Sequence, residues 1–318
     1  MGLFLALSIV SATFGCSMKT ASKTGTHASG LANDVAAVGG ALELCELEGL
    51  AKGLSVEDVC QGLRSRADDH EKGIKLLAAY GKQLDKLATA SGPEGKALAK
   101  AVLEVVEPDG LDDYTDLIAT GTDEFVKLVA RGWTRAEVRS NVKNYERTIM
   151  SVALAELVFA REALADARKA DEEVCKTMEA SAKDLDELRA NGSLAEQRFG
   201  WPMGANLVRM QVHERRQFVA RLETRLYGLL LATAYLGKWA RKEAEFKDDK
   251  KLAGTVGKAL ECAAWDKRLL DECKPHREVL SERLTANSLP KPERDPAVGM
   301  SRVVTTLPPC SAVTEETK

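Results

Sequence analysis

The pattern of apolar and polar positions is dominated by one segment, Thr134 to Ala190, which contains no proline and no glycine. Its apolar residues recur every three or four positions, the period of an amphipathic α-helix. A helix of this length would run on the order of 85 Å, far beyond the helices of most globular domains. The stripe that needs to be covered consists of Val138, Val142, Tyr145, Ile149, Ala153, Leu157, Ala160, Leu164 and Ala167.

A second long apolar pattern runs from Met203 to Phe246 and follows the first after a short connector. Two long helices joined by a short connector are expected to lie antiparallel. A further helix is expected from Leu252 to Lys274, and His276 to Ala286 extends it past Pro275. The sequence therefore predicts an all-α fold, an elongated antiparallel helical bundle built on two long helices over residues 133–286.

Smaller helices are expected before this bundle, over residues 31–132. The apolar stripes of Leu31 to Lys52 and Ser55 to Ala90 predict a helical hairpin, which three shorter helical pieces follow between prolines and glycines. After the bundle, residues 287–318 contain five prolines and little apolar pattern. That composition predicts a mostly irregular tail.

The beginning of the chain differs from everything that follows it. Met1 to Phe14 is almost wholly apolar or small, and it is too short for a permanent transmembrane helix. This is typical of the hydrophobic part of an export signal, here residues 1–15. Residues 16–30 are rich in Ser, Thr, Gly and Lys and lack an apolar period, which predicts a flexible tether.

The end of this signal, Thr13-Phe14-Gly15-Cys16, resembles the lipobox of bacterial lipoprotein precursors, with Thr13 and Phe14 in place of the usual Leu and small residue. The resemblance implies that signal peptidase cuts before Cys16 and that this cysteine carries a lipid. By analogy with enteric lipoproteins, Ser17 implies the outer membrane, with the body facing the periplasm. The alternative is a cleaved secretory signal and a soluble secreted or periplasmic protein, in which Cys16 has no special role.

The number of cysteines also favours export. The chain has seven, and an even set of six remains when Cys16 is set aside as the lipid site. Even sets of cysteines in exported proteins are typically paired in disulfides. Cys45 and Cys60 stand on opposite arms of the predicted first hairpin, so they form the favoured pair.

The other four cysteines allow several pairings. An antiparallel return of the chain would bring Cys273 to the level of Cys175, which would leave Cys262 to pair with Cys310 in the tail. A Cys262–Cys273 bridge is disfavoured as long as both residues lie on one unbroken helix. Their helical separation of about 16 Å is then far greater than the Cα distance of about 7 Å that a disulfide can span.

The strongest local concentration of charge lies on the second long helix. One interpretation is an anion-binding site for phosphate headgroups or an acidic partner. The alternative is ion pairing with acidic residues of the first long helix, from Glu162 to Glu179, which lie at a similar height in an antiparallel pair. The candidate side chains are Arg209, Arg215, Arg216, Arg221 and Arg225.

The sequence carries no short motif for catalysis. GxSxG, HExxH, P-loop and dinucleotide-binding glycine motifs are absent, and the four histidines are scattered. CxxC and paired Glu-x-x-His motifs are absent as well, so no metal and no cofactor are expected. The small net charge of −3, together with the expected export, argues against a nucleic-acid partner.

We therefore expect a non-catalytic lipoprotein of the cell envelope that acts as a structural or adaptor element through its helix faces. Its expected contacts are the membrane, through the N-terminal lipid, and one or more unidentified envelope proteins. The sequence does not tell whether the protein has a small-molecule ligand. One alternative is a membrane-active or lipid-associating helical protein. Another is a periplasmic enzyme of a type that has no recognisable short motif.

Overall fold

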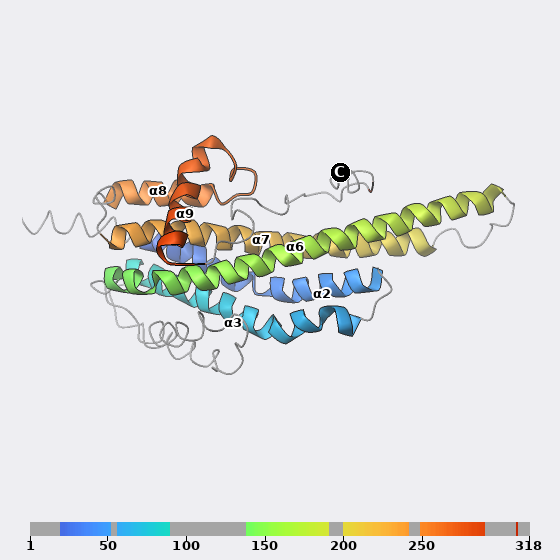
Figure 1. Ribbon diagram of the computed structural model, residues 1–318, viewed down its shortest axis with the longest axis horizontal. Coiled ribbons are helices and arrows are strands. Elements are labelled where there is room, and N and C mark those ends of the chain that lie inside the picture. Colours follow the sequence, from blue (N-terminus) through green and yellow to red (C-terminus); the bar gives the residue numbers. More distant parts are fainter. Residues whose placement is uncertain are drawn as a thin grey trace, which may run out of the picture. The chain divides into compact units, whose positions relative to one another are not determined.

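The computed structural model describes residues 20–51, 56–89, 138–190, 200–241 and 249–289, together with Cys310. Of this part of the chain 91% is helical and none of it is in a strand, which confirms the all-α class. A helix over residues 20–29 comes first. The other elements (Figure 1) are η1 (Gly30–Asn33), α2 (Ala36–Ala51), α3 (Val56–Thr89), α6 (Val138–Ala190), α7 (Gly200–Ala240), α8 (Asp249–Glu261), η3 (Asp271–Cys273) and α9 (Lys274–Ala286).

The chain divides into two compact units, each assembled from separate stretches of sequence. Because the boundaries fall inside α3, α6 and α7, each of these helices contributes residues to both units. Unit 1 consists of Met1–Val35, Asp69–Val158 and Leu222–Gly299. Unit 2 consists of Ala36–Asp68, Phe159–Arg221 and Met300–Lys318.

In unit 1, the helix over residues 20–29 lies against α3 at unusually close range. A Cβ atom on Gly25 would lie 2.4 Å from the backbone nitrogen of Asp85. On the facing helix, a Cβ atom on Gly81 would lie 2.3 Å from the backbone nitrogen of Ser29. Since real Cβ contacts are longer than this, both positions require glycine for the two helices to approach as they do.

This helix also corrects the prediction of a flexible tether over residues 16–30, which is wrong from Thr20 onward. The Ser, Thr and Gly residues that suggested a linker are the residues that hold the helix in place. The hydroxyl groups of Ser22 and Thr26 donate hydrogen bonds to the Asp85 carboxylate at 2.7 Å and 3.3 Å. Small side chains permit the close approach, so composition alone is misleading in this segment.

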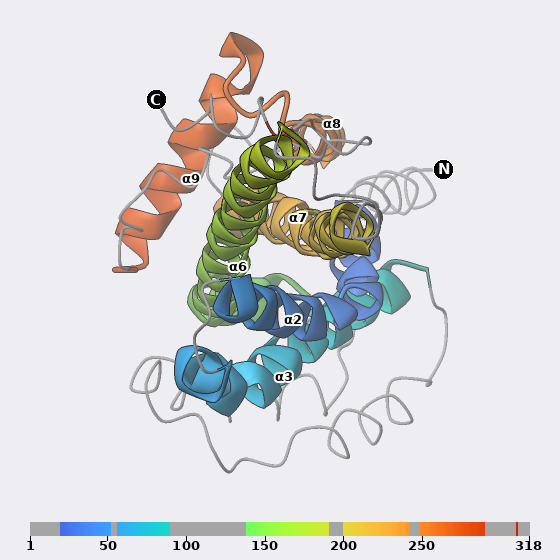
Figure 2. The ribbon, with the colours of Figure 1, turned by 90° about the vertical axis from the view of Figure 1, so that its right-hand side faces the viewer.

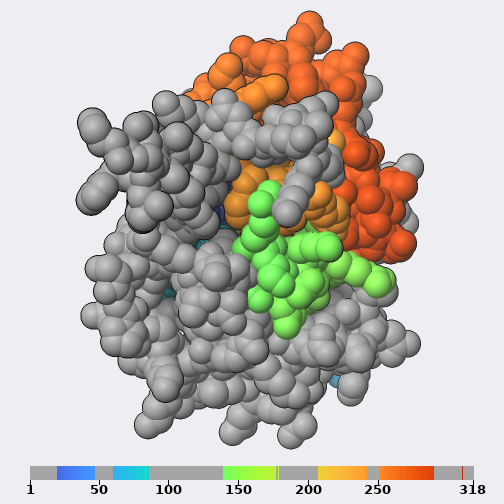
Figure 3. Space-filling view, turned by 90° about the vertical axis from the view of Figure 1, so that its left-hand side faces the viewer, coloured from blue at the N-terminus to red at the C-terminus, as the bar shows by residue number. Residues whose placement is uncertain are grey.

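The rest of unit 1 comes from α6, α7, α8 and α9. Near the start of α6, Arg139 donates a hydrogen bond of 2.8 Å to the carbonyl oxygen of Trp239 near the end of α7. Figure 3 shows the first turns of α6, in green, beside orange and red residues of the C-terminal part of the chain. The apolar core of the unit includes Ile74, Leu77, Leu84, Ile149, Ala153, Leu157, Leu226, Leu229, Leu230, Leu236, Leu252, Val256 and Leu280.

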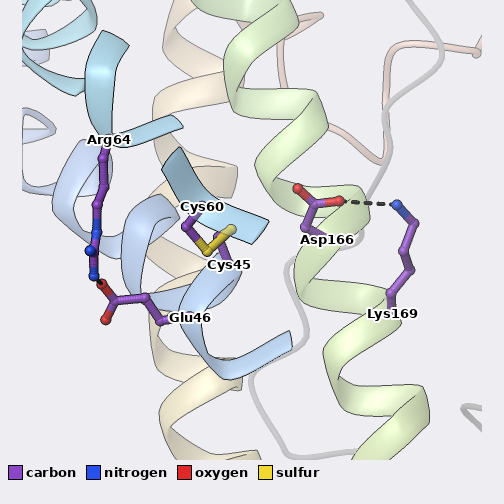
Figure 4. The surroundings of a disulfide bond; sticks show 6 residues. All are labelled: Cys45, Glu46, Cys60, Arg64, Asp166 and Lys169. Carbon is purple, nitrogen blue, oxygen red and sulfur yellow. Dashed lines mark hydrogen bonds and ion pairs between the residues drawn. A yellow bond between two sulfur atoms is a disulfide. The ribbon is translucent and has the colours of Figure 1, made fainter. Parts of the chain in front are cut away.

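Unit 2 contains α2 and the beginning of α3, which lie alongside each other in both ribbon views (Figures 1 and 2). A disulfide joins Cys45 of α2 to Cys60 of α3, with 5.9 Å between the Cα atoms. Near it, the Arg64 guanidinium donates a hydrogen bond of 2.6 Å to the Glu46 carboxylate (Figure 4). The two helices are thus linked covalently and by an ion pair.

The C-terminal helices differ from the prediction. One helix was expected from Leu252 to Lys274, but α8 ends at Glu261 and the chain then passes through turns and η3 into α9. A disulfide between Cys262 and Cys273 closes this loop. Pro275 stands in the first turn of α9, where its missing N–H group costs nothing, so it opens this helix rather than ending the previous one.

Several predicted features lie outside the described residues. These are the export signal, the short helical pieces expected between Glu94 and Arg131, and most of the irregular tail. Of the tail, only residues 287–289 and Cys310 are described. For α6, the described helix begins at Val138 and ends at Ala190, the end that the sequence predicts.

We predict that Gly81→Ala lowers the free energy of unfolding by about 2 kcal/mol, because the new methyl group would displace the backbone of the facing helix. Gly62→Ala is a matched control in the same helix, since a Cβ atom there meets nothing within 4 Å. Helix propensity alone should make the control more stable by up to about 1 kcal/mol. Urea unfolding followed by circular dichroism measures both, and equal effects of the two substitutions would contradict this packing.

Candidate functional site

Buried charged side chains in unit 1 form the largest concentration of groups that could carry chemistry. Glu146 of α6 is fully enclosed, with a side chain that is 0% exposed. Arg283 of α9 donates to both of its carboxylate oxygens, at 2.8 Å and 3.0 Å. Asn287 adds a hydrogen bond of 3.2 Å, and the Arg241 guanidinium also contacts the carboxylate.

The position of this carboxylate depends on a glycine of α7. A Cβ atom on Gly237 would lie 2.2 Å from the carboxyl carbon of Glu146, so only glycine leaves room for the acidic group. Asn287, the residue that ends α9, bonds both to Glu146 and, at 2.9 Å, to the carbonyl oxygen of Arg283. One buried carboxylate therefore joins α6, α7 and α9.

A second buried pair joins α7 to the loop after α8. Arg268 is 0% exposed and donates to both carboxylate oxygens of Glu223, at 2.6 Å and 2.7 Å. Its Nε donates a third hydrogen bond, of 2.7 Å, to the carbonyl oxygen of Ala263. The guanidinium also lies 4.4 Å from the centre of the Tyr227 ring, a cation–π distance. This geometry fixes the loop against α7.

A third pair is formed by His70 of α3 and Glu156 of α6, with 3.0 Å between Nδ1 and the carboxylate. Here too a glycine makes room, since a Cβ atom on Gly73 would lie 2.3 Å from a carboxylate oxygen of Glu156. Burial raises the pKa of Glu156 above its ordinary value, and the hydrogen bond and charge of His70 act in the opposite direction. Burial thus favours the protonated carboxyl at this position.

Two further histidines of unit 1, the half-buried His27 and the buried His276, each lie next to a hydrogen-bond partner. The ring of His27 lies 2.9 Å from the carbonyl oxygen of Arg225, and burial lowers its pKa. His276 lies 2.7 Å from the hydroxyl group of Tyr235, and burial lowers its pKa as well. A lowered pKa favours the neutral imidazole, which can be buried at little cost when one ring nitrogen is hydrogen-bonded.

These groups hold helices together through charges that are matched inside the unit. Both oxygens of Glu146 and of Glu223 accept hydrogen bonds from arginine, the arrangement that compensates the desolvation of a buried carboxylate. Within the described ranges, no three His, Cys, Asp or Glu side chains are grouped in a way that could hold a metal ion. The chemistry that this geometry supports is ion pairing.

The sequence did not single out these acidic residues, although a signal was present. Glu146 lies between Val142 and Ile149 in the apolar stripe of its helix, and Glu156 adjoins Leu157 in the same stripe. A charged residue at a core position implies a buried partner. The partners themselves come from distant segments, and the local pattern cannot identify them.

The arginines that the sequence proposed as an anion site are spread over both units. In unit 2, Arg209 pairs with Asp171 of α6 at 2.7 Å, and both side chains are buried. That is the ion pairing with the first long helix that the alternative interpretation expects. Arg215 pairs instead with Glu43 of α2, a partner that the sequence did not suggest.

The remaining candidate arginines have other surroundings. Arg225, in unit 1, pairs with Asp34 at 2.9 Å and also donates to a backbone carbonyl. Arg221 is exposed, with its guanidinium 4.5 Å from the centre of the Phe218 ring, and Arg216 is half-buried. Arg209, Arg215 and Arg225 therefore pair with carboxylates of this chain.

The six cysteines of the described residues form three disulfides. Cys45–Cys60 is the pair that the sequence favours. In unit 2, Cys175 of α6 pairs with Cys310, with 5.4 Å between the Cα atoms. The third disulfide, Cys262–Cys273, lies in unit 1, so every described cysteine is paired. Cys16, the expected lipid site, lies outside the described residues.

The expected pairing of Cys175 with Cys273, and of Cys262 with Cys310, is wrong. Cys262 and Cys273 pair with each other, with 5.6 Å between their Cα atoms. The separation of about 16 Å assumed an unbroken helix. Because α8 ends at Glu261, the chain can fold back and bring the two cysteines together.

Comparison with known proteins does not assign the chain to a family. No protein-family model matches the chain, and no characterised protein and no solved structure is significantly similar to it. Among the described helices, none combines the length and the apolar character needed to cross a membrane. The functional argument therefore rests on the residues of this chain.

We predict that Arg268→Met lowers the free energy of unfolding by about 3–5 kcal/mol, because it leaves Glu223 buried without its cation. The matched control is Arg64→Met, which breaks the exposed pair with Glu46, whose side chains are 42% and 31% exposed. We expect the control to cost no more than about 1 kcal/mol. Adding Glu223→Leu to Arg268→Met should restore most of the loss, and urea unfolding that shows no such recovery would contradict the account.

We also predict a pH-dependent effect of Glu156→Gln. Because the folded protein raises the pKa of Glu156, its stabilising contribution is complete below the unfolded value of about 4.3 and is lost as the pH rises through the folded pKa. The substituted protein cannot ionise there, so its stability relative to the wild type should increase over that window, by at most about 1.4 kcal/mol per pH unit. A stability difference that stays constant from pH 4 to pH 7 would contradict the burial of an ionisable carboxyl.

Proposed function

We propose that the chain is a non-catalytic lipoprotein of the bacterial cell envelope, anchored through Cys16 and acting as a structural or adaptor element. The lipid places it in the outer membrane, facing the periplasm. Its helical body would then present faces to one or more other envelope proteins. We further propose that α6 and α7 form the antiparallel pair of an elongated bundle.

The observation that carries this proposal is the use of the cysteines. All six in the described residues are paired, and such disulfides persist in oxidising compartments such as the periplasm. Cys16 is the seventh and is left over from this even set. A single cysteine set apart from the disulfides, directly after an apolar stretch, supports lipidation at that position.

The adaptor role is supported by the surface and the interior of the helices. The buried carboxylates of Glu146 and Glu223 are paired with arginines of the same chain, which favours a structural over a catalytic role. On α7, Leu207 and Met210 are 57% and 58% exposed. They stand three residues apart and therefore share one face of the helix, which we propose as a contact for another protein.

Mass spectrometry of the N-terminal peptide of the protein isolated from its envelope tests the anchor. We expect a chain that begins at Cys16 and carries a diacylglyceryl group, and we expect Cys16→Ser to remain unprocessed and unlipidated. A mature protein that retains the Gly15–Cys16 bond, or one that begins at an unmodified Cys16, would overturn the proposal.

A further inference from the structure

Thr20, the first described residue, marks one end of the described part of unit 1. The helix over residues 20–29 runs antiparallel to α3, because Ser22 bonds to Asp85 whereas Ser29 contacts Gly81. The end of α3 therefore lies near Thr20. Figure 1 allows the reader to follow α3 and α8 to this part of the unit.

The directions of α7 and α8 lead to the same end. Side chains near Gly257 and Gly228 give the register: Lys23 lies against Gly257, and both His27 and Ala263 lie against Gly228. Since α8 therefore runs parallel to the first helix, its beginning lies beside Thr20. In contrast, α7 runs antiparallel to the first helix, because Arg225 bonds to Gly30 whereas Gly228 contacts His27, so its final turns lie there too. Arg139 places the first turns of α6 beside them.

These segments share one electrostatic property. Every exposed charged side chain in these segments is basic; the segments are residues 20–29, 81–85, 139–147, 236–241 and 251–258. They contain two acidic residues, the half-buried Asp85 and the buried Glu146. The whole chain nevertheless carries a net charge of −3. We name this surface the basic end, and it consists of Lys23, Lys82, Lys143, Arg147, Lys251 and Lys258.

The distance from the lipid to this surface is short. If Cys16 is lipidated as proposed above, three residues separate it from Thr20, the first described residue. Four Cα–Cα steps span at most about 14 Å even when fully extended. That is less than two Debye lengths of about 8 Å at physiological ionic strength, so charges near Thr20 remain within reach of the headgroups.

We propose that the basic end of unit 1 binds the anionic surface of the bilayer that holds the Cys16 lipid. This inference deepens the proposed function and rests on it for the identity of the membrane. Two independent features identify an anionic bilayer as the binding partner. They are the short distance from Cys16 to Thr20 and the opposite charges of the basic side chains and the anionic headgroups. The lipid holds this end at the bilayer surface, and basic side chains there add electrostatic attraction to anionic headgroups.

Vesicle binding by the unanchored chain tests the surface without the lipid. The probe is the full mature chain with Cys16→Ser, mixed with vesicles of neutral phosphatidylcholine or with vesicles that contain about one third phosphatidylglycerol. We expect sedimentation with the anionic vesicles and little with the neutral ones, with an affinity that falls as salt is added. Equal binding to the two vesicle types, or binding to neither, would overturn the inference.

A charge variant and a matched control locate the contact. Lys23→Gln, Lys143→Gln and Lys251→Gln together remove three charges of the basic end and should weaken anionic vesicle binding by about a hundredfold, at roughly fivefold per residue. The control removes the same number of charges from exposed residues elsewhere, by Arg66→Gln, Lys176→Gln and Lys274→Gln. We expect less than a twofold change for the control. Equal weakening by both variants would overturn the assignment to the basic end.

The orientation can be measured on the lipidated protein itself. In proteoliposomes, acylation of Lys23 by a water-soluble reagent should be several times slower than in detergent-free Cys16→Ser protein, whereas Lys176 should react equally in both. Unchanged Lys23 reactivity would overturn the orientation.

The two proposals can fail separately. An unmodified Cys16 would contradict the lipid anchor but leave vesicle binding by the basic end intact. A lipidated Cys16 with no effect of the charge variant would contradict only the role of the basic end.

Discussion

A charge buried in an apolar helical core must be matched by a nearby opposite charge, and the described structure depends on this constraint. Glu146 of α6 and Glu223 of α7 occupy positions that the helical pattern directs to the interior. Their partners, Arg283 and Arg268, come from the C-terminal segment. These pairs therefore tie the last helices and the loop between them to the long helices. In both pairs the two carboxylate oxygens accept hydrogen bonds from an arginine of the same chain.

Local pattern was sufficient to predict the helices, because an amphipathic stripe depends only on neighbouring residues. It predicted the end of α6 at Ala190 and the all-α class. It failed where the cause was tertiary. The helix over residues 20–29 has a composition typical of a linker, and only its contact with α3 through Gly25 and Gly81 accounts for its burial. The loop after Glu261 likewise has tertiary contacts that the local pattern does not contain, since Arg268 is bound to Glu223 on another helix.

The candidate sites show the same division. The sequence pointed to the cysteines and to the favoured Cys45–Cys60 pair, because both residues belong to one local hairpin. It could not pair Cys175 with Cys310, since that link depends on the path of a distant segment. For the arginines it offered an anion site or internal ion pairs. The structure shows internal pairs at Arg209, Arg215 and Arg225, and it draws attention to a different basic surface, around the entry of the chain at Thr20.

The account joins an oxidising compartment, a lipidated Cys16 and a helical body held close to the membrane, and the state of the seven thiols tests these elements together. The protein should be isolated from its own envelope, denatured without reductant and treated with an excess of maleimide, and the adducts counted by intact mass. The account predicts no adduct, because six cysteines are in disulfides and the seventh carries a lipid. One adduct at Cys16 would contradict the anchor, and adducts at the other six cysteines would contradict the disulfides and the exported location.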